Sequence, residues 1–265
     1  MQSGQESFPF DTAERIQPVP QRRISEKVDE LMARRDYAGV ERTLLYWLEE
    51  ARAGHDRRGE LMIRNELVGH YRKTGQAQKA KESAAEALSL LEATELEGSI
   101  SAAITRVNIA TALNAFGENE EALALFQQAR AIMERSPGCT PSLLGGLYNN
   151  MGLALTALNR PAEAMSLYSQ AMAQMEKAPN GALEQAVTCL NMANAVESRD
   201  GLEAGDAQIQ LLLSRGEALL DTPSLPRDGY YAYVCEKCAP TYEYYGWFLL
   251  AQQLRETAEA IYAGA

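Results

Sequence analysis

The chain has 265 residues, of which 46% are hydrophobic, and its formal net charge is −11. This apolar content is sufficient for a continuous core, whereas the acidic balance and the lack of Lys and Arg clusters exclude a general affinity for nucleic acid or an anionic membrane. Because four cysteines are too few for a disulfide framework and no apolar run reaches the roughly eighteen residues of a membrane span, we expect a cytoplasmic protein.

The first residues are polar, and Pro18 and Pro20 disfavour a helix there. We therefore expect residues 1–23 to form a flexible N-terminal tail. The aromatic side chains of Phe8 and Phe10 leave a second possibility open, in which the tail docks on the folded part of the chain.

From about Ile24 onward, apolar residues recur at intervals of three and four, which predicts helices along residues 24–265. Self-similarity is strongest in the middle, where small residues repeat every 42 positions: Ala80, Ala122 and Ala164, followed by Ala87, Ala129 and Ala171. A fixed period of this kind indicates stacked structural repeats, each too small to bury its apolar face alone.

Each repeat is expected to be a pair of antiparallel helices. The six predicted pairs are residues 24–54, 62–93, 104–135, 146–177, 186–221 and 229–263. Thr140 and Asp228 are candidate N-caps. In the fifth pair an insertion near residues 199–206 shifts the frame, and Ile209, Leu213 and Gly216 are assigned to its second helix.

The tight crossings of these pairs are assigned to small residues. Gly152 on a first helix is expected to face Ala164 on the second, while the large residues Phe126 and Tyr168 fill the gap toward the next pair.

One unit carries a specific pattern: Ile109-Ala110, Leu113, Gly117, Ala122, Phe126 and Ala129. This pattern resembles the tetratricopeptide repeat. The 42-residue spacing is similar to the long-helix variant in kinesin light chains and in bacterial peptide-sensing regulators. The resemblance implies an all-α, right-handed superhelix of helix pairs. One departure is glutamate where a proline commonly ends the unit, at Glu92, Glu134 and Glu176.

The resemblance also implies a non-catalytic protein–protein interaction module whose first helices line a concave groove. Asn108, Asn150 and Asn191 occupy equivalent slots, and a carboxamide both donates to and accepts from a peptide backbone. The predicted peptide-binding residues are Asn65, Asn108, Thr111, Asn150, Leu153, Asn191, Asn194, Tyr233, Lys237 and Tyr244. In the alternative interpretation, the amides bond between adjacent repeats and only rigidify the stack.

Six of the twelve tyrosines fall in the predicted first helix of the last pair. An exposed cluster favours an interface, because tyrosine offers a large contact area at low entropic cost. A bulky cap over the end of the array is the alternative interpretation. Tyr242 is expected to pack inside, whereas Tyr233 and Tyr244 are expected to point into the groove.

Cys235 and Cys238 form the one metal-like or redox-like motif. A structural zinc site needs four ligands, and only His55 and His70 offer imidazoles. The repeat frame turns both cysteines toward the partner helix, which favours buried hydrophobic roles. A metal or thiol-redox role is the less favoured alternative, and we expect neither a metal nor a cofactor.

No nucleotide-binding or hydrolase motif occurs, so we expect no enzymatic activity. The expected partner is a peptide or protein segment, with neither nucleic acid nor membrane involved. A regulatory sensor whose superhelix responds to a signalling peptide is the alternative function. Self-association into a homodimer through an exposed end of the array is left open.

Overall fold

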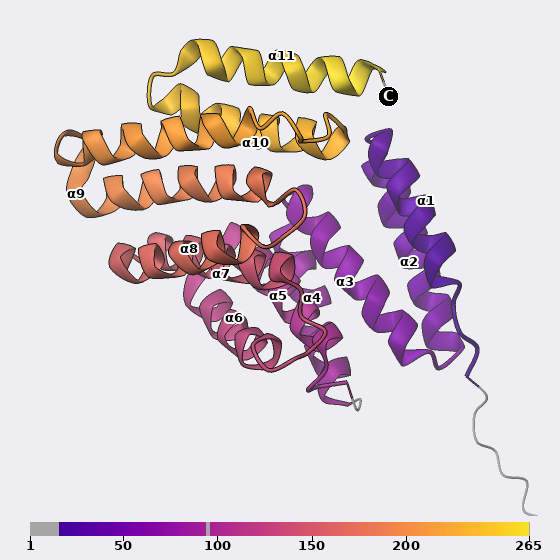
Figure 1. Cartoon of the computed structure of the whole chain (residues 1–265). Coiled ribbons are helices and arrows are strands. Elements are labelled where there is room, and N and C mark those ends of the chain that lie inside the picture. The colour runs from indigo at the N-terminus through magenta and orange to yellow at the C-terminus, as the bar shows by residue number, and fades with distance from the viewer. Residues whose placement is uncertain (1–15, 94–95, 265) are drawn as a thin grey trace, which may run out of the picture. The chain divides into compact units, whose positions relative to one another are not determined.

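The computed structural model describes residues 16–93 and 96–264, and Phe8 and Phe10 lie outside this part. The chain divides into two compact units, Met1–Glu97 and Gly98–Ala265. Within the described residues all regular secondary structure is helical, in eleven segments (Figure 1), which confirms the all-α prediction. Among these segments, none combines the length and the apolar character that crossing a bilayer requires.

The first unit contains two antiparallel helix pairs. Its helices are α1 (Gln21–Ala33), α2 (Tyr37–Ala53), α3 (Arg57–Lys73) and α4 (Ala77–Glu92). Each helix contacts the next along the chain. Asp36 and Asp56 cap α2 and α3 by accepting backbone hydrogen bonds from Gly39 and Gly59, at 2.8 and 2.9 Å.

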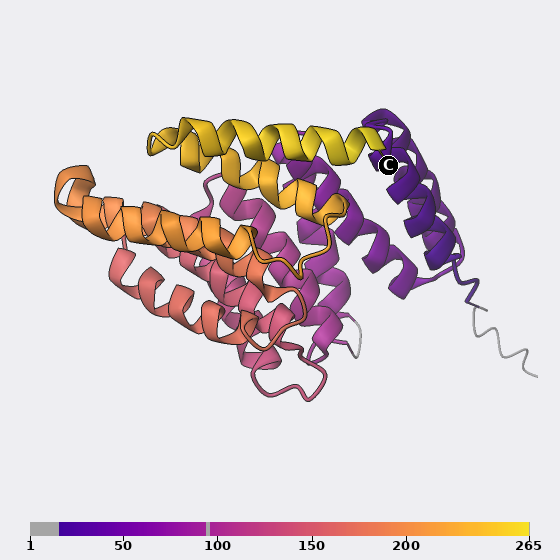
Figure 2. The same ribbon diagram turned by 45° about the horizontal axis from the view of Figure 1, so that its top comes forward.

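The second unit contains the remaining helix pairs. Its helices are α5 (Ile100–Ala115), α6 (Asn119–Met133), α7 (Pro141–Ala157), α8 (Pro161–Met175), α9 (Gly181–Leu220), α10 (Gly229–Tyr244) and α11 (Phe248–Gly264). Both views show α11 running beside α10 (Figures 1 and 2). The side chains of Thr140 and Asp228 accept backbone hydrogen bonds at the starts of α7 and α10, so both predicted N-caps are confirmed.

Helix α9 is a hairpin in itself, because Gly201 interrupts it with φ 78° and ψ 169°. This backbone conformation is open to glycine and to few other residues. The two arms pack against each other, and the residues assigned from sequence to the second arm, Ile209, Leu213 and Gly216, are all buried. The shifted frame of the fifth pair therefore does not break the core.

The crossing of α7 and α8 differs from the prediction. A Cβ atom on Gly152 would lie 2.4 Å from a ring carbon of Tyr168. Tyr168 therefore fills the space over Gly152 in its own helix pair. Its hydroxyl lies 3.2 Å from Oγ1 of Thr156, which satisfies the buried polar end of the ring.

The N-terminal boundary also differs from the prediction, because α1 begins at Gln21, before the expected end of the tail at residue 23. The preceding segment binds the turn between α2 and α3. The backbone N–H of Gln17 donates to the carbonyl of Gly54 at 2.8 Å, and that of Val19 donates to Oδ2 of Asp56 at 2.9 Å. Val19 is buried. Asp56 thus has two roles, since one carboxylate oxygen holds this segment and the other caps α3.

Candidate peptide-binding face

Four helical segments of the second unit are the first members of their pairs: α5, α7, the N-terminal arm of α9, and α10. Neighbours in this series contact each other. Their exposed and half-buried residues from the predicted groove form a surface that we call the first-helix face: Asn108, Thr111, Asn150, Leu153, Asn191, Asn194, Tyr233, Lys237 and Tyr244. Asn65 lies on α3 in the other unit, so this face does not include it.

Hydrogen bonds between neighbouring repeats hold the amides in place. Nδ2 of Asn150 donates to Oγ1 of Thr111 at 3.3 Å, and Nδ2 of Asn191 donates to Oδ1 of Asn149 at 3.0 Å. The hydroxyl of Thr188 donates to the same Asn149 oxygen at 3.1 Å. The bracing expected in the alternative interpretation is therefore present.

Asn149 is the residue that sequence reasoning missed. Its side chain is only 5% exposed, and its Oδ1 accepts from two groups of the following repeat. A buried acceptor with two donors is costly to leave unpaired, so this amide fixes how α9 sits on α7. The signal in the sequence was a second asparagine directly before Asn150, where the two neighbouring repeats carry the apolar residues Val107 and Leu190.

The braced amides keep part of their surface exposed. Asn108, Asn150 and Asn191 are all half-buried. Leu153 is half-buried on α7, and the hydroxyl of Thr111 donates to the carbonyl of Val107 at 2.7 Å. Binding of a ligand by these residues stays a prediction.

Tyrosines of α10 and the turn after it bind carboxylates and an amide of α9. The hydroxyl of Tyr244 donates to Oε1 of Glu197 at 2.6 Å. The hydroxyl of Tyr245 lies 2.7 Å from Oε2 of the same carboxylate and 3.0 Å from Oδ1 of Asn194. Both oxygens of Glu197 are thus held by phenols, and Tyr244 remains 63% exposed.

A second tyrosine group lies at the start of α10. Tyr230 and Tyr233 stack with ring centres 6.2 Å apart, and the hydroxyl of Tyr230 donates to Glu184 of α9. The two tyrosines are 48% and 51% exposed. Burial raises the pKa of the Glu184 carboxyl, and the positive charge of Lys237 partly opposes this shift.

The tyrosines therefore divide between core and surface. Tyr242 is fully buried, as predicted, and its hydroxyl donates to the carbonyl of Leu213 at 3.1 Å. Tyr231 is buried as well. Tyr230, Tyr233 and Tyr244 keep large exposed areas, and Tyr230 and Tyr244 also donate to carboxylates of α9; exposed tyrosines of this kind favour an interface.

The cysteine pair lies in the core, where Cys235 and Cys238 are at most 1% exposed. Burial raises the pKa of the two thiols to about 11 and about 12. A thiolate is the reactive and metal-binding form, so this environment disfavours both roles. In the part of the chain that the structure describes, no three His, Cys, Asp or Glu side chains gather in a way that suits a metal ion.

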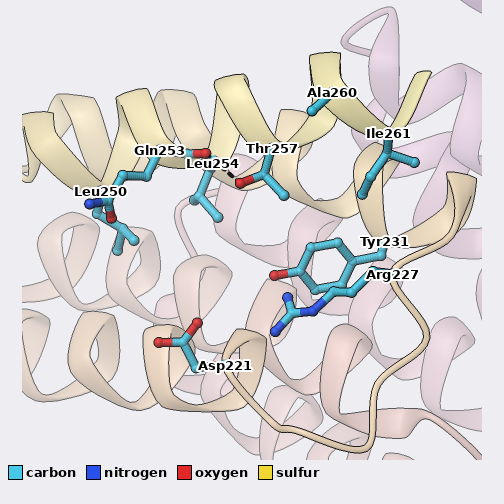
Figure 3. A pocket seen from close by; sticks show the side chains of 9 residues that line it. All are labelled: Asp221, Arg227, Tyr231, Leu250, Gln253, Leu254, Thr257, Ala260 and Ile261. Atoms are coloured by element: carbon cyan, nitrogen blue, oxygen red, sulfur yellow. Dashed lines mark hydrogen bonds between the residues drawn. The ribbon is translucent and has the colours of Figure 1, made fainter. Parts of the chain in front are cut away.

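A cavity of about 670 Å³ lies against α11, and none of its lining residues belongs to the first-helix face (Figure 3). It is lined by Asp221, Arg227, Tyr231, Leu250, Gln253, Leu254, Thr257, Ala260 and Ile261. Figure 3 shows Arg227 lying along Tyr231, with its guanidinium carbon 4.1 Å from the ring centre. Its Nη1 also donates to the carbonyl of Leu220 at 3.3 Å, so Arg227 links the end of α9 to Tyr231 of α10.

The helical-repeat fold is that of a scaffold for protein–protein interaction. Comparison with family models is consistent with that class: residues 59–135 and residues 145–178 each match a model described as tetratricopeptide repeat. The chain therefore contains tetratricopeptide repeats in these two stretches. Repeats of this fold are typically non-catalytic.

Solved structures show the same fold. A Podosopora anserina protein, described by its kinesin light chain nearly identical TPR-like repeats, is 23% identical with a TM-score of 0.53, over 77% of this chain and 95% of that one. BtubC (BKLC) from P. vanneervenii is 17% identical with a TM-score of 0.51, over 93% of this chain and 92% of that one. A comparison with curated proteins finds no match.

Proposed function

We propose that this protein binds an extended peptide or protein segment of a partner along the first-helix face of its second unit, without catalysing a reaction. The observation that carries the proposal is a row of partly exposed amides and phenols whose positions are fixed by hydrogen bonds between neighbouring first helices. Fixing these groups before binding lowers the entropic cost of ordering them around a ligand.

The chemistry of the face supports a backbone-directed mode. Each half-buried carboxamide has both a donor and an acceptor group, which suits the alternating N–H and C=O groups of an extended chain. The exposed tyrosines add wide apolar contact with a polar tip, and such residues are enriched at interfaces. Contacts from the carboxamides to the peptide backbone do not depend on the peptide's side chains, so they would position a bound segment. The exposed tyrosines would select among segments.

Peptides selected from a random display library on the full-length protein test this proposal. Asn191→Ala and Tyr244→Ala are each expected to weaken the binding of the selected peptides by about fivefold to tenfold. This is the loss in affinity expected when one hydrogen bond or one aromatic contact is removed. The matched control is Gln252→Ala, which removes an exposed side-chain bond on α11. Peptides that bind equally to all three variants would place recognition elsewhere.

A further inference from the structure

Two tyrosine–glutamate pairs in this chain are completed by a cation. In the second unit, the hydroxyl of Tyr148 donates to Glu134 at 2.8 Å, Arg130 pairs with that carboxylate at 2.6 Å, and the guanidinium lies 5.4 Å from the centre of the Tyr148 ring. Each member therefore contacts the other two. The cation gains an ion pair and an aromatic face at once.

The first unit contains the same arrangement. The hydroxyl of Tyr71 donates to Glu41 at 3.1 Å, and Nζ of Lys79 lies 2.8 Å from Glu41 and 5.4 Å from the Tyr71 ring centre. The two triads use different cations and come from different positions in the repeat. What they share is a phenol-bound carboxylate beside the tyrosine ring, with a Lys or Arg side chain placed against both; the Tyr71 and Tyr148 residues are themselves buried.

The tyrosine–glutamate site on the first-helix face lacks the third member. Glu197 accepts from Tyr244 and contacts Tyr245, yet among the described residues it takes part in no ion pair. Hydroxyl donors fix the carboxylate without neutralising its charge. The rings of Tyr244 and Tyr245 meet edge to face at 4.9 Å, and Tyr244 is largely exposed beside the charge.

The neighbouring cations of the chain are directed elsewhere. Arg199 lies two residues from Glu197, but it pairs with Asp200 at 2.6 Å and donates to Gln208 at 3.0 Å. Lys237 on α10 acts on the carboxyl of Glu184, at the other tyrosine group. The cation that would complete the Glu197 site therefore has to come from outside these contacts.

We infer that a lysine or arginine side chain of the bound segment packs against the ring of Tyr244 and forms an ion pair with Glu197. The partner of this face is therefore a segment that contains a basic residue. This inference rests on the proposed function and adds the charge of the ligand to it. The net charge of −11 favours the approach of such a segment at low ionic strength.

The test uses peptides of about twelve residues displayed as a random library, selected on the full-length protein, on Glu197→Gln and on Glu259→Gln. Glu259 is an exposed glutamate of α11 and serves as the charge-matched control. We expect Lys or Arg to be enriched at one position with the unchanged protein and with Glu259→Gln, and to lose that enrichment with Glu197→Gln.

A double-mutant cycle then isolates the contact. In a selected peptide the basic residue is replaced by citrulline, which keeps the shape of arginine without its charge. We expect this change to weaken binding about tenfold to the unchanged protein and hardly at all to Glu197→Gln. Tyr244→Phe, which keeps the ring and loses the hydroxyl, should retain part of the arginine preference, and thermal melting of each variant verifies that it is folded.

The outcomes separate the two proposals. Two results overturn the inference and leave the proposed function standing. In the first, the selected peptides depend on Asn191 but show no preference for a basic residue. In the second, replacement by citrulline weakens binding to Glu197→Gln as much as it weakens binding to the unchanged protein. Peptides with a Glu197-coupled basic residue that ignore Asn191 support the inference and contradict the proposed backbone mode. A library that yields no peptide overturns both.

Discussion

Asn191 donates its amide hydrogen to Oδ1 of Asn149, its neighbour one repeat earlier, at 3.0 Å. The donor is half-buried on the first-helix face and the acceptor is buried beneath it. This pair ties the proposed binding surface to the core, so the geometry of the surface depends on a hydrogen bond inside the stack. Replacing the buried acceptor should therefore act on stability, whereas replacing the half-buried donor should act on recognition.

Replacing the buried member should act on stability. Asn149→Ala removes the acceptor of both Thr188 and Asn191, and we expect the free energy of unfolding to fall by about 1–3 kcal/mol. Urea titration followed by circular dichroism measures this. Gln252→Ala, which loses only an exposed bond to Glu256, should stay within about 0.5 kcal/mol. Equal stability of the two variants would contradict the bracing role of Asn149.

Gly152→Leu should overpack the crossing of α7 and α8. The new Cβ would fall 2.4 Å from the Tyr168 ring, and we expect a loss of about 1–3 kcal/mol in unfolding free energy. Gly146→Ala on the same helix is the control, because no atom lies within 4 Å of a Cβ there. That variant should gain about 0.5–1 kcal/mol from helix propensity. A tolerated leucine would show that the helices separate freely.

Asp56 should matter more than its counterpart Asp36. Both cap a helix, but only Asp56 also accepts the backbone N–H of Val19. Asp36→Ala should cost about 1 kcal/mol, and Asp56→Ala about 1 kcal/mol more. Chemical denaturation gives the two values. Limited proteolysis near residue 17 should accelerate only in Asp56→Ala, and identical cleavage in both variants would argue against the docked segment.

Thiol reactivity should follow burial. Cys139 is half-buried, whereas Cys189, Cys235 and Cys238 are buried, so one thiol should react rapidly with an aromatic disulfide reagent and three only on unfolding. Rapid reaction of more than one thiol in the folded protein would contradict the core placement.

The raised thiol pKa values also predict a dependence of stability on pH. The pKa is about 11 for Cys235 in the folded chain and about 8.5 for an unfolded thiol, so from about pH 8.5 upward the unfolded chain holds fewer protons than the folded one. The contribution of the thiol to stability is therefore complete below that pH and lost as pH rises toward 11. Cys235→Ala combined with Cys238→Ala should flatten this slope in thermal melts, and an unchanged slope would rule the thiols out as its cause.

Local signals in the sequence were sufficient for the helix pairs. Gly117 adopts a φ of 85° at a helix end, and Thr140 and Asp228 cap the helices that their side chains predicted. Features that depend on contacts distant in sequence were not predictable in this way. Val19 is held by the second oxygen of Asp56, and Tyr168 turns back over Gly152, because the three-dimensional packing offers each a partner that periodicity does not encode.

The site was predicted in the same partial manner. Repeat register located Asn150 and Asn191, but their bonds to Thr111 and Asn149 depend on how one repeat is rotated on the next. Of the two interpretations left open for these amides, the bonds between repeats are present in the structure, and ligand binding stays a prediction. The tyrosine-held Glu197 was not foreseen, because nothing in its own helix distinguishes it from a solvated glutamate.

Site-specific photocrosslinking locates a bound peptide most directly. A photoreactive benzophenone side chain replaces Leu153 on the first-helix face, or in a second variant Gln127, an exposed residue of the second helix α6. With a peptide selected on the unchanged protein, we predict crosslinking from position 153 and none from position 127. Crosslinking from position 127 alone would contradict the proposal that the first helices form the binding surface.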